Sequence, residues 1–268
     1  MPVIDAHVHV LDSYLPMAPF DDLGRPDRML YLMAECRVDR ALLVPVVTDF
    51  SPDNNAECGD LVREHPDRFS ALTDVQLHLP TASELIRTAR ETYEAVGISY
   101  YPSSSDVEWM LDDDCAPVWE TIESQDLVCS LQIHPGNYTV LLELARRYPK
   151  VKFQSNHLAL PSSLDEADDT YGGFAEAANL PNLSVKASGF YAAAKTPWDF
   201  RCARVLAFFR RLLEIVGPDR VLWGSDWPPS ARHLTYLQNL EHIRTFTSLK
   251  APDLAKVLGE NAARIYGI

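Results

Sequence analysis

The chain has 268 residues, of which 47% are hydrophobic and 23% are charged, a composition typical of a globular protein rather than a disordered or fibrous one. The 24 Lys and Arg residues are outnumbered by 38 Asp and Glu residues, so the formal net charge is −14. This charge argues against binding to nucleic acid or to a membrane surface, because both require clusters of cationic side chains. We therefore expect a small-molecule substrate as the partner, and the composition leaves a homo-oligomer open.

Cysteine usage and hydropathy bear on the cellular location. The five cysteines are an odd number without C-x-x-C spacing, so neither a disulfide framework nor a zinc knuckle is indicated. The longest apolar stretch, residues 41–47, is far shorter than the roughly 20 residues that a membrane-spanning helix needs. Polar residues at positions 5, 7 and 9 interrupt the apolar segment that a secretory signal requires. We expect a cytoplasmic protein.

Short β-rich segments alternate along the chain with longer segments in which apolar residues recur every three or four positions. This alternation is the pattern of repeated βα units around a parallel sheet. Eight units of about 33 residues use the whole chain, in agreement with the roughly 250 residues of a (β/α)8 barrel. The sequence therefore predicts an α/β fold, a single (β/α)8 TIM barrel domain over residues 1–268. The predicted strands are residues 3–10, 40–47, 69–77, 95–101, 127–134, 151–157, 183–188 and 220–226, and the clearest predicted helices are residues 81–92, 139–148 and 198–216.

Signatures of competing enzyme folds are absent from the sequence. No G-x-G-x-x-G follows the first predicted strand, and no glycine-rich run ends in Lys followed by Ser or Thr, as Rossmann domains and P-loops require. Neither a G-x-S-x-G elbow nor an H-E-x-x-H helix occurs. The barrel is therefore favoured over an open nucleotide-binding sheet.

The first predicted strand carries three polar residues at alternate positions, Asp5, His7 and His9. Alternate residues of a strand share one face, and the apolar residues between them are expected to pack on the outer helices. Asp5, His7 and His9 should then point into the barrel, where buried polar groups need partners. The alternative to a functional site is a hydrogen-bonded cluster in the core.

Polar residues also close three other predicted strands. His134 ends the fifth, His157 the sixth and Asp226 the eighth. Because the carboxyl ends of the strands form the active-site face of such barrels, these side chains should converge on one mouth. His134 taken alone would more readily be structural, and it is the convergence of the set that indicates a site.

Five motifs distributed over the whole chain give it a family resemblance. The sequence resembles the amidohydrolase-related (amidohydrolase 2) family of the amidohydrolase superfamily. It is most similar to the branch of the pyrone dicarboxylate lactonases and more distantly similar to the aminocarboxymuconate semialdehyde decarboxylase group. The motifs are I-D-A-H-V-H at 4–9, N-H-L-A at 156–159, V-K-A-S-G at 185–189, L-W-G-S-D-W-P at 222–228 and G-E-N-A-A-R-I-Y-G at 259–267.

The resemblance implies a hydrolase that adds an activated water to the carbonyl of a small lactone or a related ester or amide. By the family pattern, Asp226 is the general base and His157 orients or polarises the carbonyl. The pair His7 and His9 binds a divalent metal or polarises the substrate directly. Two alternatives stay open, a metal-dependent non-oxidative decarboxylase of a small carboxylic acid and a barrel that binds a ligand without catalysis.

The metal is the point on which the two branches differ. The lactonase branch generally works without metal and has no histidine at the end of strand five, whereas the decarboxylase-like branch uses one as a ligand. His134 would complete a ligand set of His7, His9, His134 and Asp226. Mixed nitrogen and oxygen donors suit Zn²⁺ best and Mn²⁺ also. We expect a divalent metal, with a metal-free mechanism still open.

The substrate should be less anionic than a dicarboxylate. Lactonases of dicarboxylates clamp the carboxylates with Arg near strand four, whereas residues 97–102 contain no Arg. Aromatic residues at the predicted strand ends suggest an apolar pocket, and Lys186 on strand seven is expected either to contact the substrate or to be structural. The substrate-binding candidates are Tyr101, Trp109, Lys186, Tyr191, Trp198 and Trp227.

Overall fold

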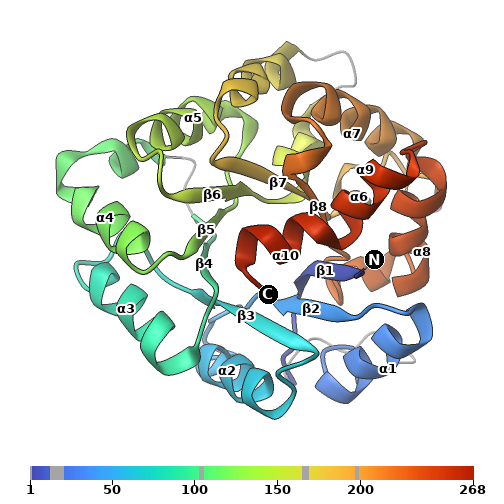
Figure 1. Ribbon diagram of the computed structural model, residues 1–268, viewed down its shortest axis with the longest axis horizontal. Coiled ribbons are helices and arrows are strands. Elements are labelled where there is room, and N and C mark those ends of the chain that lie inside the picture. The colour runs from blue at the N-terminus through green and yellow to red at the C-terminus, as the bar shows by residue number, and fades with distance from the viewer. Residues whose placement is uncertain (1, 13–20, 103–105, 165–168, 197–198) are drawn as a thin grey trace.

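The computed structural model describes residues 2–12, 21–102, 106–164, 169–196 and 199–268. Within these ranges, eight parallel strands form one sheet in the order β1 to β8, each hydrogen-bonded to the next along the chain. The end of β1 and the residues after β8 close the ring: the His9 amide donates to the carbonyl of Trp227 at 2.7 Å, and the Asp226 amide donates to the carbonyl of His7 at 2.9 Å. Figure 1 shows the ring of strands inside a layer of helices. The predicted (β/α)8 barrel is confirmed.

Each predicted strand contains an observed one, but the observed strands end earlier. The reason is that the last residues of each predicted strand leave the ladder of backbone hydrogen bonds and turn into the loops of the mouth. The strands are β1 (Ile4–Val8), β2 (Arg40–Leu43), β3 (Phe69–Asp74), β4 (Gly97–Tyr100), β5 (Val128–Leu131), β6 (Lys152–Ser155), β7 (Leu183–Ala187) and β8 (Val221–Trp223).

The helices cover the outside of the ring with their apolar faces. In α7, for example, the buried residues Val205, Phe208, Phe209 and Leu212 recur at three- and four-residue spacing and face the barrel. The α-helices are α1 (Pro26–Cys36), α2 (Asn54–Glu64), α3 (Ala82–Tyr93), α4 (Ala116–Ser124), α5 (Tyr138–Arg147), α6 (Phe190–Ala193), α7 (Ala203–Val216), α8 (Tyr236–Glu241), α9 (Ala251–Ala255) and α10 (Asn261–Tyr266). Short 3₁₀ turns connect several of them, and π-helical turns occupy His242–Phe246 and Lys256–Glu260.

One end of the barrel interior is filled by apolar side chains. Leu42, Leu72 and Leu222, from three strands, form a buried cluster with Ala262 and Tyr266 of α10. Figure 1 looks onto this end, where α10 lies across the ring of strands. A ligand can therefore reach the interior only from the opposite end, where the strands terminate.

A β-bulge in β1 changes the predicted orientation of its side chains. Asp5 pairs with Ala41 and Val8 with Leu43, so three steps along β1 span two steps along β2. Ile4 and Ala6 consequently lie in the interior cluster instead of against the outer helices. Asp5 faces outward and accepts a hydrogen bond of 2.9 Å from the hydroxyl of Tyr236 in α8. The expectation that Asp5 points into the barrel with the histidines was wrong.

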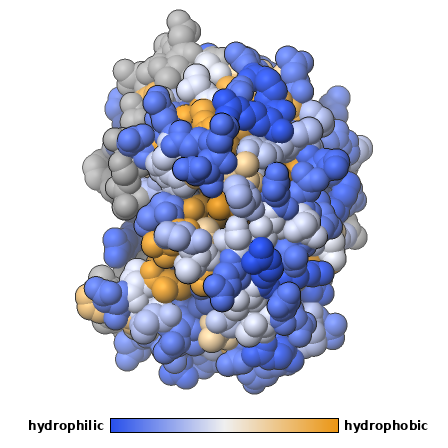
Figure 2. Space-filling model, turned by 90° about the vertical axis from the view of Figure 1, so that its left-hand side faces the viewer, coloured by the Kyte–Doolittle hydropathy of each residue, from blue (hydrophilic) through white to orange (hydrophobic). Residues whose placement is uncertain are grey.

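One face of the exterior is mostly polar. Figure 2 shows the face over α3, α4 and α5 as largely hydrophilic, interrupted by several hydrophobic areas. Among the residues that the structure describes, no helix combines the length and apolar character needed to cross a membrane.

Candidate active site

Three buried side chains meet at the carboxyl ends of β1 and β8. Nε2 of His7 lies 3.2 Å from Nε2 of His9. Oδ1 of Asp226 lies 3.3 Å from Nε2 of His9 and 3.6 Å from Nε2 of His7. The bulge in β1 makes this possible, because it brings His7 to the mouth although Ala6 before it also faces inward. The sequence-predicted convergence of His7, His9 and Asp226 therefore occurs.

Two glycines leave space for imidazoles at the mouth, Gly224 for His7 and Gly189 for His157. A Cβ atom at Gly224 would lie 2.7 Å from Cβ of His7, and one at Gly189 would lie 2.7 Å from Nδ1 of His157. Gly189 also has a φ of +63°, which side chains rarely adopt. Glycine is therefore required for steric reasons at position 224 of the W-G-S-D motif and at position 189 of the K-A-S-G motif.

His157 reaches the cluster from an unusual turn after β6. Residues 157–160 all have positive φ, from +51° to +59°, and Asp226 itself has a φ of +57°. Such backbone costs about 1 to 3 kcal/mol per residue and tends to occur at functional sites. Nδ1 of His157 lies 3.0 Å from Oγ of Ser188 and 4.0 Å from Oδ2 of Asp226. The turn places an imidazole beside the carboxylate.

The charges at the mouth are set by burial and by one another. Burial by itself would raise the pKa of Asp226, but the nearby His157 and His9 and a hydrogen bond from Tyr191 lower it to about 2. Burial lowers the pKa of His157 and, with the help of the Lys186 ammonium, holds the pKa of His7 well below its ordinary value. At neutral pH the site therefore presents the ionised carboxylate of Asp226 beside the neutral imidazoles of His7 and His157.

A cavity of about 430 Å³ opens onto this cluster, a size suited to a small molecule. Tyr191 donates a hydrogen bond of 2.8 Å to Oδ2 of Asp226, and the hydroxyl of Tyr101 lies 3.5 Å from Nε2 of His7. Both predicted tyrosines line the cavity together with the carboxylate. Its lining comprises His9, Val46, Val47, Thr48, Asp74, Gln76, Tyr101, Gln132, His157, Tyr191, Asp226 and Pro229.

The donor atoms of His7, His9 and Asp226 have the spacing of a tetrahedral metal site. Ligand atoms around zinc, with bonds of about 2.0 to 2.1 Å, lie about 3.3 to 3.4 Å apart, and the three separations here are 3.2, 3.3 and 3.6 Å. Nδ1 of His9 lies 2.7 Å from the carbonyl oxygen of Val44. Because a carbonyl only accepts, Nδ1 carries the proton and Nε2 presents its lone pair. His157 offers a further nitrogen, since ligand atoms of His7, His157 and Asp226 lie within 4.8 Å of one another. These residues form a candidate metal site.

Lys186 lies beneath the cluster, fully buried inside the barrel. Its Nζ is 3.5 Å from Nδ1 of His7 and 3.3 Å from Oγ of Ser130, and burial lowers the pKa of Lys186 to about 7. An ammonium at this position donates to Nδ1 of His7 and leaves the imidazole proton on Nε2, whereas a neutral amine can accept from Nδ1 and leaves Nε2 free. Lys186 therefore acts on His7, and it does not line the cavity.

The family model for amidohydrolases matches residues 4–268. This chain belongs to the amidohydrolase family. The L-fucono-1,5-lactonase of Burkholderia ambifaria is 30% identical to it over 172 residues, which are 61% of this chain and 58% of that protein. The match thus spans less than two thirds of the length of this relative.

Solved structures share the fold of this amidohydrolase along its whole length. An amidohydrolase from Burkholderia multivorans, solved with zinc bound, is 20% identical, with a TM-score of 0.80 and 100% of both chains covered. A probable 2-pyrone-4,6-dicarboxylic acid hydrolase from Acinetobacter baumannii, solved with citric acid, is 19% identical, with a TM-score of 0.78 and the same coverage. The family resemblance read from the motifs is confirmed, and these structures show the fold.

His134 does not join the cluster of this amidohydrolase. Strand β5 ends at Leu131, and His134 caps a 3₁₀ turn at Pro135–Asn137 with its side chain exposed. The prediction that His134 completes the ligand set extended strand alternation beyond the point where the strand ends. Of the predicted ligands, the structure brings together His7, His9 and Asp226, with His157 beside them in place of His134.

The predicted tryptophan contacts also differ from the structure. The ring of Trp227 packs on Tyr236, and its Nε1 donates to the carbonyl of Leu23 at 2.9 Å. Trp109 packs on Tyr100 at a centroid distance of 6.2 Å. Neither lines the cavity, because the ring of Trp227 packs on Tyr236 of α8 and the ring of Trp109 packs on Tyr100 of β4. Trp198 lies outside the described residues.

Sequence reasoning missed the polar side of the cavity. The expected apolar, aromatic lining is wrong for much of it, since Thr48, Asp74, Gln76 and Gln132 are among the lining residues. The signal was present in the alternation of Asp74 and Gln76 at the end of the third predicted strand. Asp and Gln are common on surfaces, so this alternation does not by itself indicate a cavity.

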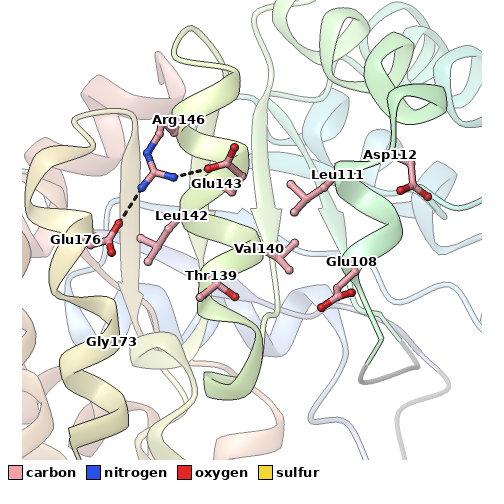
Figure 3. A pocket seen from close by; sticks show the side chains of 10 residues that line it. All are labelled: Glu108, Leu111, Asp112, Thr139, Val140, Leu142, Glu143, Arg146, Gly173 and Glu176. Carbon is pink, nitrogen blue, oxygen red and sulfur yellow. Dashed lines mark hydrogen bonds and ion pairs between the residues drawn. The ribbon is translucent and has the colours of Figure 1, made fainter.

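A second hollow, of about 550 Å³, lies on the outer helices. Figure 3 shows it between α5 and its neighbours, with Arg146 joined to Glu143 and Glu176. The described residues that line it include no histidine or cysteine. The one cationic side chain among these described lining residues, Arg146, is paired with Glu143 and Glu176, and the candidate catalytic residues lie at the barrel mouth instead.

Proposed function

We propose that this amidohydrolase hydrolyses a small, uncharged lactone by adding an activated water to the ring carbonyl. The observation that carries the proposal is the ionised Asp226, which shares an open cavity with His157 and is oriented by Tyr191. The partial match to an L-fucono-1,5-lactonase supports lactone hydrolysis over other reactions of the family. The reaction consumes one water and yields one hydroxy acid.

Asp226 acts as the proton acceptor. It takes a proton from water as the water oxygen forms a bond to the carbonyl carbon, and it returns that proton to the ring oxygen when the carbon–oxygen bond of the ring breaks. Tyr191 keeps Oδ2 in place through its hydrogen bond of 2.8 Å. His157 lies close enough to Asp226 to orient the carbonyl, and Tyr101 offers a further hydroxyl at the cavity wall.

A divalent metal, most readily Zn²⁺, fits the donors of His7, His9 and Asp226. Bound there, it would polarise the carbonyl and lower the pKa of water. The zinc in the Burkholderia multivorans structure supports this assignment. Without metal, the N–H of His7 that Lys186 favours when protonated would polarise the carbonyl directly.

The charge of the lining supports an uncharged substrate. Two carboxylates, Asp74 and Asp226, line the cavity, and its described lining residues include no Lys or Arg. An anionic substrate would therefore meet these two carboxylates with no Lys or Arg of the described lining to pair with. This agrees with the expectation of a substrate less anionic than a dicarboxylate.

Ring opening can be followed by NMR and by acid release with L-fucono-1,5-lactone and with 2-pyrone-4,6-dicarboxylate. We expect the wild-type protein to open the neutral lactone with the higher kcat/KM. Preference for the dicarboxylate would contradict the proposed substrate charge. Release of CO2 from small carboxylic acids, with no lactone opened, would replace hydrolysis by decarboxylation. Absence of turnover of any of these compounds would favour a binding function.

A further inference from the structure

Asp74 presents a carboxylate to the catalytic cavity and is held in place by its surroundings. Its backbone amide donates to Oδ1 of Asn55 at 2.8 Å, and its carbonyl accepts from Nδ2 of the same residue at 3.0 Å. Its Oδ2 accepts from the amide of Val47 at 3.0 Å, and its Oδ1 accepts from Nε2 of Gln76 at 3.2 Å. Four hydrogen bonds therefore fix the position of a group that the proposed proton transfers do not use.

The partners of this carboxylate are all uncharged. In the described part of the chain, no Lys, Arg or His makes an ion pair with Asp74 at 4.0 Å or less. A carboxylate has about four acceptor positions, and the two hydrogen bonds from Val47 and Gln76 use only part of this capacity. Burial raises the pKa of Asp74, as expected for a carboxylate without a counter-ion. The remaining acceptors are available to a ligand in the cavity.

Two amides line the same cavity as Asp74. Gln76 and Gln132 line it with Asp74, and the side chain of Gln132 makes no hydrogen bond within the described chain. Amides both donate and accept, whereas the carboxylate only accepts. We call Asp74, Gln76 and Gln132 the polar wall. Asp74 ends β3, and Gln76 and Gln132 follow β3 and β5, whereas His9 and Asp226 follow β1 and β8.

We propose that the polar wall binds hydroxyl groups of the lactone ring, so that the substrate class is a polyhydroxylated, uncharged lactone of the aldonolactone type. This inference rests on the proposed lactone hydrolysis and names its substrate class. A hydroxyl group both donates and accepts, so each can satisfy an acceptor on Asp74 and a donor on an amide. An ammonium group only donates and would leave the amide N–H groups without partners.

The expected preference for hydroxylated lactones, measured as a ratio of kcat/KM values, follows from the free-energy cost of leaving polar groups unpaired. A hydrogen bond to a charged group contributes about 1.5 to 3 kcal/mol, which corresponds to about 10- to 100-fold in kcat/KM. Sites built to bind a hydroxyl reject analogues without it more strongly still. The wall should therefore separate hydroxylated lactones from deoxygenated ones of the same ring size.

The experiment compares two six-membered lactones, L-fucono-1,5-lactone with ring hydroxyls and δ-valerolactone without them. We expect the wild-type protein to prefer the hydroxylated lactone in kcat/KM. We expect Asp74→Asn to reduce that preference by about 10- to 100-fold, mainly through KM for the hydroxylated lactone. Gln132→Met should also reduce the preference, and it removes no hydrogen bond within the described protein. Asp219→Asn is the matched control on the surface, where Asp219 pairs with Lys256, and should keep the preference.

Several results would overturn the inference. These are an unchanged preference in Asp74→Asn and Gln132→Met, equal losses with both lactones, or a wild-type preference for α-amino-γ-butyrolactone, which carries an ammonium group. Calorimetric titration of Asp226→Asn with L-fucono-1,5-lactone separates this inference from the proposed function. One outcome supports hydroxyl binding by the polar wall and contradicts lactone hydrolysis. In that outcome the wild type opens no lactone, the Asp226→Asn variant binds L-fucono-1,5-lactone, and the double variant with Asp74→Asn does not bind it.

Discussion

Tyr191 donates a hydrogen bond of 2.8 Å to Oδ2 of Asp226, across the gap between α6 and the end of β8. The bond orients the carboxylate and helps to keep its pKa low. In Tyr191→Phe we expect kcat to fall by about 10- to 100-fold, the loss of one hydrogen bond to a charged group, with KM changed less. Steady-state kinetics on a neutral lactone measures this, and an unchanged kcat would show that the hydroxyl does not position Asp226.

Asp226→Asn removes the proton acceptor while keeping the shape of the side chain. We expect kcat to fall by about 10²- to 10⁴-fold, the usual contribution of a general base. Circular dichroism should show that the fold is retained. The same change at Asp219, which is on the surface and pairs with Lys256, should leave kcat unaltered. Residual turnover near the wild-type rate in Asp226→Asn would assign the base to another group.

The metal content of two variants tests whether His9 or His134 is a metal ligand. His9→Ala removes a nitrogen that lies 3.2 Å from His7 and 3.3 Å from Asp226, so zinc bound in the wild type should be lost. His134 is exposed and outside the cluster, so His134→Ala should keep both metal and activity. Elemental analysis of protein purified without added metal tests both. Loss of metal in His134→Ala would show that His134 is a ligand after all. Full activity of the metal-free wild type would favour polarisation of the substrate carbonyl by His7 without metal.

Gly224 gives His7 its space. In Gly224→Ala the new Cβ would lie 2.7 Å from Cβ of His7 and 3.1 Å from its amide nitrogen, so the imidazole must move. Displacement by about 1 Å can cost about 10²-fold in rate, and we expect a loss of this order together with a lower melting temperature. Gly136→Ala is the control, because its Cβ would meet no atom within 4 Å. Equal activity of the two variants would contradict the steric requirement.

Protonation of Asp74 should lower kcat/KM for a hydroxylated lactone at acid pH. Burial raises the pKa of Asp74 above its ordinary value of 3.8, whereas the pKa of Asp226 is about 2. As pH falls through the raised pKa, Asp74 becomes protonated while Asp226 is still ionised. The kcat/KM for a hydroxylated lactone should then decline at a higher pH than that for δ-valerolactone. The two pH profiles measure this difference, and Asp74→Asn should remove it. Coincident profiles in the wild type would count against a hydroxyl-binding role.

Local periodicity predicted much of this protein. Each observed strand lies inside a predicted one, because alternating β segments and amphipathic helices are recorded in neighbouring residues. Asp226 lies three residues beyond the end of β8 at Trp223, and it stays at the mouth because its amide donates to the carbonyl of His7 in β1. His134 could not be placed from the sequence, since the end of β5 depends on its pairing with β4 and β6. A strand end is a tertiary property whenever the ladder stops before the local pattern does.

The sequence by itself determined the barrel, the order of its strands and the histidines and aspartate that its motifs carry. Only the tertiary structure decided which of these residues meet. The bulge in β1 turns Asp5 outward to Tyr236 and brings His7 to the mouth, because the hydrogen bonds that define it come from β2 and from the segment after β8. The polar wall likewise combines Asp74 of β3 with Gln132 after β5 in the lining of one cavity. Both depend on contacts between residues far apart in the chain, which periodicity along one segment does not record.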